Sequence, residues 1–101
     1  MEWLWTWGGK CFGYRDNDDL WTHDGHHVGR FYDDEVYGPD GRYLGELNNE
    51  RLITHRSKTN RRKASFSLRG GRVGIVKSVG YVGYVMLAGY EDFPGPEAFR
   101  G

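Results

Sequence analysis

The chain has 101 residues, of which 16 are glycine and 3 are proline, and 16% of its residues are aromatic. This length provides one domain with a single core, and abundant glycine and aromatic residues with little proline exclude a disordered linker and favour β-structure. The net charge is zero, and the single cysteine, Cys11, excludes an internal disulfide.

The first ten residues, MEWLWTWGGK, lack the basic and apolar regions of a secretory signal. The longest weakly polar run, residues 78–90, is too short to cross a membrane as a helix. We therefore expect a cytoplasmic protein without a transmembrane segment. The sequence contains no phosphate-binding loop, paired-cysteine zinc spacing or nucleophile elbow, so it predicts neither an enzyme nor a cofactor.

The two halves of the chain carry opposite charge. Residues 1–50 hold four Lys and Arg against eleven Asp and Glu, a net charge of −7. Residues 51–101 hold ten against three, a net charge of +7. Such halves suit head-to-tail docking between copies, a protein partner, or contact with an anionic partner. In a repeat fold the halves can also interleave and mix their charges.

A sixteen-residue repeat begins at Leu4. The first two blocks, LWTWGGKCFGYRDNDD and LWTHDGHHVGRFYDDE, agree at 6 of 16 positions, and the fourth block loses the pattern. The first column of the repeat holds Leu4, Leu20, Val36 and Leu52. The second column holds Trp5, Trp21, Tyr37 and Ile53. The sixth column holds Gly9, Gly25 and Gly41, and the tenth holds Gly13, Gly29 and Gly45.

Each block predicts one β-hairpin, with the Asp-Gly pairs of blocks two and three as type I′ turns. The polar clusters DNDD, YDDE and NNER then turn the chain into the next block. A regular ladder would place each second-column residue opposite the ninth column, which holds Phe12, Val28 and Leu44, and each tenth-column glycine opposite the first column. The predicted fold is all-β. Four hairpin repeats over residues 4–67 form a pseudo-four-fold, flower-like or shallow barrel arrangement.

The Gly-rich segment 70–93 is predicted to close this array. Read as a strand, it is apolar on both faces, which indicates burial on both sides. A glycine-rich helix is the alternative for residues 78–90. The two prolines of residues 94–101 predict an irregular tail.

The repeated Leu-Trp/Tyr…Asp-Gly…Val/Leu-Gly hairpins and the stretch GYVGYVMLAGYEDFP resemble the bacterial four-fold β-flower family over roughly residues 3–95. The resemblance implies a shallow β-architecture with four hairpin petals, and it implies no activity. The fourth block departs from the pattern, because Arg56-Ser57 replaces Asp-Gly.

The densest group of charges lies in HRSKTNRRK, residues 55–63. Its cations are Arg56, Lys58, Arg61, Arg62 and Lys63. They are suited to the phosphates of anionic lipid head groups or nucleic acid, and a cation near a membrane surface contributes about 1 kcal/mol. The alternative is an exposed loop whose positive charges balance those of the acidic turns. We expect a non-catalytic binding or interaction module, with a self-assembly scaffold as the alternative.

Four histidines are candidate ligands for Zn²⁺ or Cu²⁺: His23, His26, His27 and His55. No cysteine or carboxylate completes a known ligand spacing, so a metal-dependent hydrolase is the weakest hypothesis. Trp5 and Trp21 are expected to pack in the core. The alternative is that the wider aromatic set forms cages for choline or sugars: Trp3, Trp5, Trp7, Trp21, Tyr14, Tyr37 and Tyr43.

Overall fold

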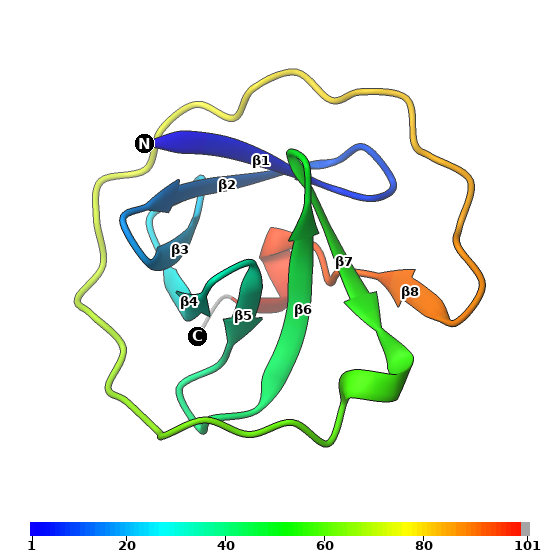
Figure 1. Cartoon of the computed structure of the whole chain (residues 1–101). Coiled ribbons are helices and arrows are strands. Elements are labelled where there is room, and N and C mark those ends of the chain that lie inside the picture. Colours follow the sequence, from blue (N-terminus) through cyan, green and yellow to red (C-terminus); the bar gives the residue numbers. More distant parts are fainter. Residues whose placement is uncertain (100–101) are drawn as a thin grey trace.

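In the computed structural model, which describes residues 1–99, seven strands close into a barrel and an eighth strand extends it (Figure 1). The barrel strands are β1 (Glu2–Thr6), β2 (Cys11–Asp16), β3 (Asp19–Thr22), β4 (His27–Tyr32), β5 (Glu35–Tyr37), β6 (Tyr43–Asn48) and β7 (Arg51–His55). Successive strands pair antiparallel, and a parallel pairing of β1 with β7 closes the ring. The predicted all-β fold of hairpin repeats is confirmed.

The first column of the repeat fills the barrel. Its residues Leu4, Leu20, Val36 and Leu52 are completely buried and pack with Phe12, Val28, Phe31 and Phe93. The tenth-column glycines lie opposite the first column, as predicted, in the pairs Leu4–Gly13, Leu20–Gly29 and Val36–Gly45. A Cβ on Gly13 would overlap the carbonyl of Trp21 on the next strand, which explains why glycine is needed there.

A β-bulge in each of the first three hairpins changes the expected register of the second column. The bulges lie at Leu4/Trp5, Leu20/Trp21 and Val36/Tyr37. The aromatic residues therefore pair with the eighth column, as Trp5–Cys11, Trp21–His27 and Tyr37–Tyr43. The prediction that they face the ninth column is wrong, because it assumed a regular ladder. The bulge leaves the first and ninth columns inside the barrel and places the second column outside it.

The turns also differ from the type I′ prediction. In the Asp-Gly pairs only the glycine has positive φ, 91° at Gly25 and 83° at Gly41. The tight two-residue turns are those at the polar clusters, where Asn17, Asp33 and Asn49 have φ between 55° and 58°. Asn and Asp tolerate this left-handed conformation better than other non-glycine residues.

Two distant segments make the fourth hairpin. After β7 the chain forms the short helix η1 (Arg56–Lys58) and leaves the barrel. It returns as β8 (Tyr90–Asp92), which pairs antiparallel with β7. Phe93, directly after β8, is buried in the core cluster and takes the place that Phe12 has in the first hairpin. The helix η2 (Pro96–Phe99) follows, and the ring of Phe99 contacts those of Phe12 and Phe93.

Residues 59–89 run around the outside of the barrel as a belt (Figure 1). The belt contains no helix or strand, apart from a single bridge between Arg42 and Arg62. Val79, Val82 and Val85 are 74%, 87% and 90% exposed. The prediction of a buried strand or helix over residues 78–90 is therefore wrong. The predicted irregular tail forms η2 up to Phe99, and residues 100–101 lie outside the described residues.

The belt is attached at every third residue. The N–H groups of six belt residues donate to carbonyls of the hairpin turns at 2.7–3.1 Å: Lys63 to Gly41, Phe66 to Pro39, Arg72 to Gly25, Ile75 to His23, Tyr81 to Gly9, and Tyr84 to Trp7. Between them, the N–H of Arg69 donates to Nδ1 of His27 at 2.8 Å. Three residues per turn is the period of a polyproline II chain, which presents the same side at every third residue.

Nine belt residues match one sixteen-residue hairpin. The turn glycines Gly41, Gly25 and Gly9 are sixteen residues apart, whereas their partners Lys63, Arg72 and Tyr81 are nine apart. The partner side chains also lie over equivalent rings: Lys63 over Tyr37 at 5.8 Å, Arg72 over Trp21 at 3.9 Å, and Tyr81 against Trp5 at 4.8 Å. The belt is thus a second repeat, which the sequence did not lead us to expect.

The belt also decides the role of the tryptophans. Trp5 and Trp21 are buried as predicted, but they lie between barrel and belt and outside the central core cluster. The indole N–H of Trp5 donates to the carbonyl of Val79 at 2.9 Å, and that of Trp7 to the carbonyl of Val85 at 3.0 Å. The rings that an aromatic cage would use contact the belt instead.

The substitution Gly25→Ala tests the attachment of the belt. It places a Cβ against the carbonyl of Arg72 at a φ of 91°. The left-handed conformation alone costs an L-residue about 1–2 kcal/mol. Because the overlap adds to this cost, we expect the free energy of unfolding to fall by at least about 2 kcal/mol in a urea titration. Gly70→Ala is the control, since a Cβ there meets no atom within 4 Å. Equal stability of the two variants would contradict the attachment.

Candidate functional site

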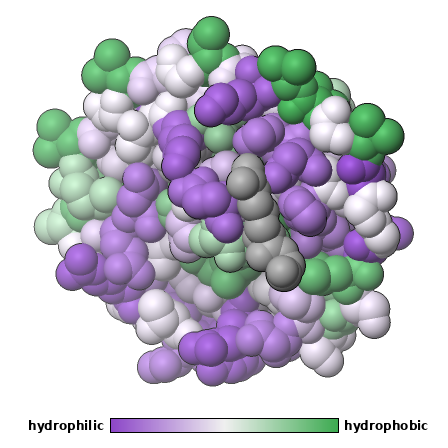
Figure 2. Space-filling view, turned by 180° about the vertical axis from the view of Figure 1, so that it is seen from behind, coloured by the Kyte–Doolittle hydropathy of each residue, from purple (hydrophilic) through white to green (hydrophobic). Residues whose placement is uncertain are grey.

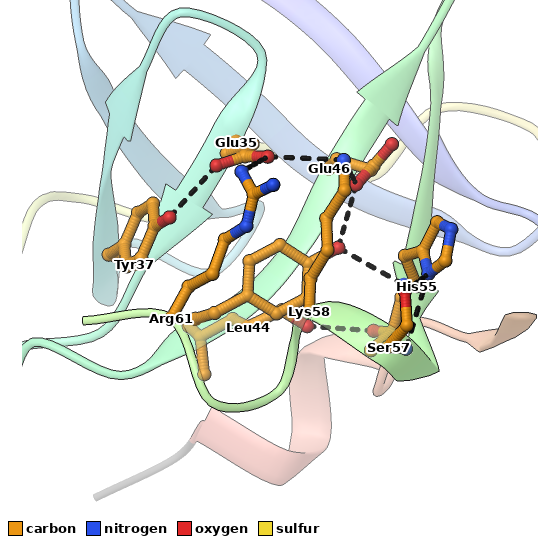
Figure 3. Close-up of polar contacts among 10 residues, drawn as sticks. Glu35, Tyr37, Leu44, Glu46, His55, Ser57, Lys58 and Arg61 are labelled. Atoms are coloured by element: carbon orange, nitrogen blue, oxygen red, sulfur yellow. Dashed lines mark hydrogen bonds and ion pairs between the residues drawn. The ribbon is translucent and has the colours of Figure 1, made fainter. Parts of the chain in front are cut away.

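The basic run 55–63 lies against the third hairpin, where two of its cations are neutralised (Figure 3). Nζ of Lys58 lies 2.8 Å from Oε1 of Glu46 and 3.1 Å from Oε2 of Glu35. The guanidinium of Arg61 lies 2.8 Å from the same Glu35 oxygen. Glu35 and Glu46 are cross-strand neighbours, and like charges in that position repel. The two cations remove this repulsion.

Two tyrosines complete the cluster. Tyr37 and Tyr43 donate their hydroxyls to Glu35 and Glu46, both at 2.8 Å. Burial raises the pKa of both tyrosines, and the neighbouring carboxylates raise it further. Burial alone would raise the pKa of Glu35, but the hydrogen bonds from Tyr37 and Lys58 lower it overall. The cluster therefore holds two carboxylates and two cations at neutral pH, and it offers no excess positive charge to an anion.

Of the other three cations of the run, only Lys63 borders the same pocket as this pair. Arg56 is exposed and lies in the helix η1. Arg62 donates to the carbonyls of Thr59 and Arg61 at 3.4 and 3.2 Å. Lys63 lies over the rings of Tyr32 and Tyr37. The structure thus brings Lys58, Arg61 and Lys63 together around one pocket, which four acidic side chains also line, and it leaves Arg56 and Arg62 outside that pocket.

The opposite charges of the two halves meet within the chain. Besides the pairs of Lys58 and Arg61, ion pairs between the halves are Arg69–Asp19 at 2.7 Å, Arg72–Asp16 at 2.8 Å and Lys10–Glu97 at 2.7 Å. The halves interleave, which was the alternative to docking between copies. Charge alone therefore gives weak support to head-to-tail assembly.

The four histidines occupy different environments. His26 lies 3.9 Å from Asp24 on a hairpin turn, and the ring of His55 packs against Tyr90. His23 borders a cavity beneath the belt, and His27 is buried. Within residues 1–99 no group of three histidine, cysteine or carboxylate side chains is placed to hold a metal ion.

His27 fixes the belt to the second hairpin. Its ring stacks on Trp21 at 5.0 Å, and its Nδ1 accepts the N–H of Arg69. Nε2 therefore carries the ring proton, and it faces Oδ1 of Asp19 at 3.1 Å and the carbonyl of Gly29 at 3.0 Å. The guanidinium of Arg69 binds the second Asp19 oxygen at 2.7 Å. This group is fully satisfied and is a structural anchor. The sequence did not reveal this anchoring role of His27, because its partner Arg69 lies 42 residues away along the chain.

The outer face of the belt carries a row of exposed valines at three-residue spacing: Val73, Val76, Val79, Val82 and Val85. Each is at least 74% exposed. Viewed from behind, apolar groups gather around the edge of the molecule, whereas the middle of that face is mainly hydrophilic (Figure 2). Single exposed apolar residues are ordinary, but a regular row of five on one segment points to a contact with another molecule.

These features define a closed seven-stranded barrel, extended by one strand and encircled by an extended belt of the same chain. In residues 1–99 no helix combines the length and apolar character that a membrane span requires. No protein-family model, curated protein or solved structure matches the chain.

Stability should depend on pH through His27. Burial lowers the pKa of this ring, although Asp19 and the Gly29 carbonyl oppose the effect. The unfolded chain thus binds the proton at a higher pH than the folded chain, so the contribution of His27 is complete above about pH 6.5 and is lost as the pH falls through the lowered pKa. We expect the free energy of unfolding to decrease between about pH 7.5 and pH 5.

Urea titrations across that range provide the measurement. In His27→Gln the decrease should be smaller than in the unchanged protein. The neighbouring His26→Gln is the control and should retain the full decrease, because that side chain is 44% exposed. A decrease that is unchanged in His27→Gln would contradict the assignment.

Proposed function

We propose that this chain is a non-catalytic interaction module that self-associates along the outer face of its belt. The observation that carries the proposal is the row of five exposed valines. An apolar side chain removed from water contributes about 25 cal/mol per Å² of buried apolar surface. The valine row can be buried against another molecule in this way without any change in the barrel.

The belt backbone favours a polypeptide as the occupant. The N–H groups of the five valines have no hydrogen-bond partner within residues 1–99. An extended edge with open N–H groups is a template for another extended chain. A bilayer core cannot satisfy these groups, so the same edge is poorly suited to enter lipid.

A second copy supplies a matching occupant. Its belt is itself an extended chain with the same three-residue spacing, so two belts side by side bring valine against valine. The carbonyls of Val79, Val82 and Val85 already accept hydrogen bonds within the chain, so the valine side chains provide most of the contact. Identical surfaces that meet in this way form a two-fold dimer, which is the commonest oligomer. Contact with an anionic surface through the basic run has less support, because Lys58 and Arg61 are held by Glu35 and Glu46.

We further propose that the chain belongs to the bacterial four-fold β-flower family and acts in the cytoplasm. Four hairpins around one barrel support the family assignment. A free thiol at Cys11 suits a reducing compartment.

Sedimentation velocity over a roughly hundredfold range of protein concentration tests the self-association. We expect a concentration-dependent dimer, and we expect the double variant Val76→Ser, Val82→Ser to be monomeric over the same range. Both valines are nearly fully exposed, so the variant should fold normally. The control is Ser65→Thr with Ser67→Thr, two exposed belt positions outside the valine row. A protein that stays monomeric at every concentration would overturn the proposal.

Salt distinguishes this contact from docking of opposite charges. A dimer held by apolar side chains and backbone hydrogen bonds persists at about 1 M NaCl, where charges more than about 3 Å apart are screened. A dimer that dissociates at high salt and ignores the valine substitutions would favour docking between the acidic and basic halves.

A further inference from the structure

A cavity lies beneath the belt, where the first two hairpins meet. Its volume is about 740 Å³, within the range of small-molecule sites. The side chains that line it include Lys10, Cys11, His23, Ile75, Lys77 and Glu97. Apolar, basic and acidic side chains line it, and it borders the valine row at Val76.

Comparison with the next junction around the barrel explains why the cavity is there. The two junctions are related by the two repeats: a barrel residue of the first junction corresponds to the residue sixteen positions later, and a belt residue to the residue nine positions earlier. Cys11, Ile75 and Ser78 at the first correspond to His27, Phe66 and Arg69 at the second. At the second junction His27 and Arg69 are bonded to each other and Phe66 packs beside them, and the cavity there is about 330 Å³. Three smaller side chains leave the first junction open.

One residue also changes the chemistry of the cavity. Lys77 corresponds in the nine-residue repeat to Leu68 and Met86, so a cation stands where the other two repeats have apolar residues. Lys10 pairs with Glu97 at 2.7 Å, which leaves Lys77 as the cavity-lining lysine without a carboxylate partner among the described residues. A departure from an internal repeat that costs apolar contact is typical of a functional position.

Lys77 and the buried Cys11 line the same cavity. Burial raises the pKa of the Cys11 thiol, while a hydrogen bond from the Ser78 N–H and the charge of Lys77 act in the opposite direction. The Ser78 N–H therefore already has a partner in the Cys11 sulfur. The exposed ammonium of Lys77, beside an apolar wall that includes Ile75, is an arrangement suited to an anionic group attached to an apolar body.

We infer that this cavity binds a small organic anion, a carboxylate or phosphate monoester, with Lys77 at the charged group and Ile75 against the apolar part. The ligand enters between the first two hairpins and contacts the belt from inside. Its test is separate from that of self-association, because the cavity variants change Lys77 and Ile75 and leave all five valines of the row intact.

Titration of the full chain with benzoate and with phenyl phosphate, followed by amide chemical shifts, tests the inference. The probes should shift the amides of Ser78 and Gly80, which border the cavity. Neutral benzamide should bind at least about tenfold more weakly, because a charge-assisted hydrogen bond is lost. Inorganic phosphate tests whether the apolar part contributes, and it should bind more weakly than phenyl phosphate.

Two variants copy residues that the chain already uses at equivalent positions, so both should fold. Lys77→Met, as at Met86, should weaken benzoate binding about tenfold. Ile75→Phe, as at Phe66, should fill the cavity and abolish binding. Arg62→Met is the matched control, since this exposed belt cation lies outside the cavity lining. An equal loss in Arg62→Met, or benzamide binding as tight as benzoate binding, would overturn the inference. So would the absence of any shift at Ser78 and Gly80.

Discussion

The backbone hydrogen bonds between the belt and the hairpin turns determine how the rest of the structure is arranged. Together with the bond from Arg69 to His27, they follow a three-residue spacing along the belt and a sixteen-residue spacing along the barrel. Each repeat therefore has to keep its own period for these bonds to form. The turn glycines Gly9 and Gly25 are constrained twice, by positive φ and by the belt carbonyl that occupies the place of a Cβ. The second-column aromatics lie outside the barrel, and Trp21 is only 1% exposed because the belt covers it. Barrel and belt therefore stabilise each other.

The fold could be predicted from the sequence at positions where the type of side chain determines the structure. Leu4 opposite Gly13 followed from the period of the repeat, and it is observed. The register of Trp5 did not follow, because a bulge has no fixed residue signature. The nine-residue repeat escaped detection because the belt binds through N–H groups, which every residue except proline supplies. Valines at every third position, read in alternation, look like a strand apolar on both faces, which explains the incorrect burial of residues 78–90.

The same holds for the candidate sites: the residue types were evident from the sequence, but their contacts depend on the fold. The charge of the run 55–63 is evident from the sequence, but its neutralisation depends on Glu35 and Glu46, which reach it only through the pairing of β5 with β6. The cavity beneath the belt is even harder to predict from the sequence. It arises from the difference between two junctions, and Cys11 is unremarkable until it is compared with His27. That comparison requires both repeats in their correct register.

The fourth hairpin has a consequence for the order in which the chain folds. Its two strands, β7 and β8, pair His55 with Tyr90, and the aromatic residue that completes the core follows at Phe93. A chain synthesised from its N-terminus thus presents three complete hairpins and an unfilled barrel until residues 90–93 have emerged. Contacts of such long sequence separation form slowly. The open barrel edge and the uncovered ring of tryptophans are the surfaces a nascent chain would expose, and a chaperone or a neighbouring nascent chain would meet them first.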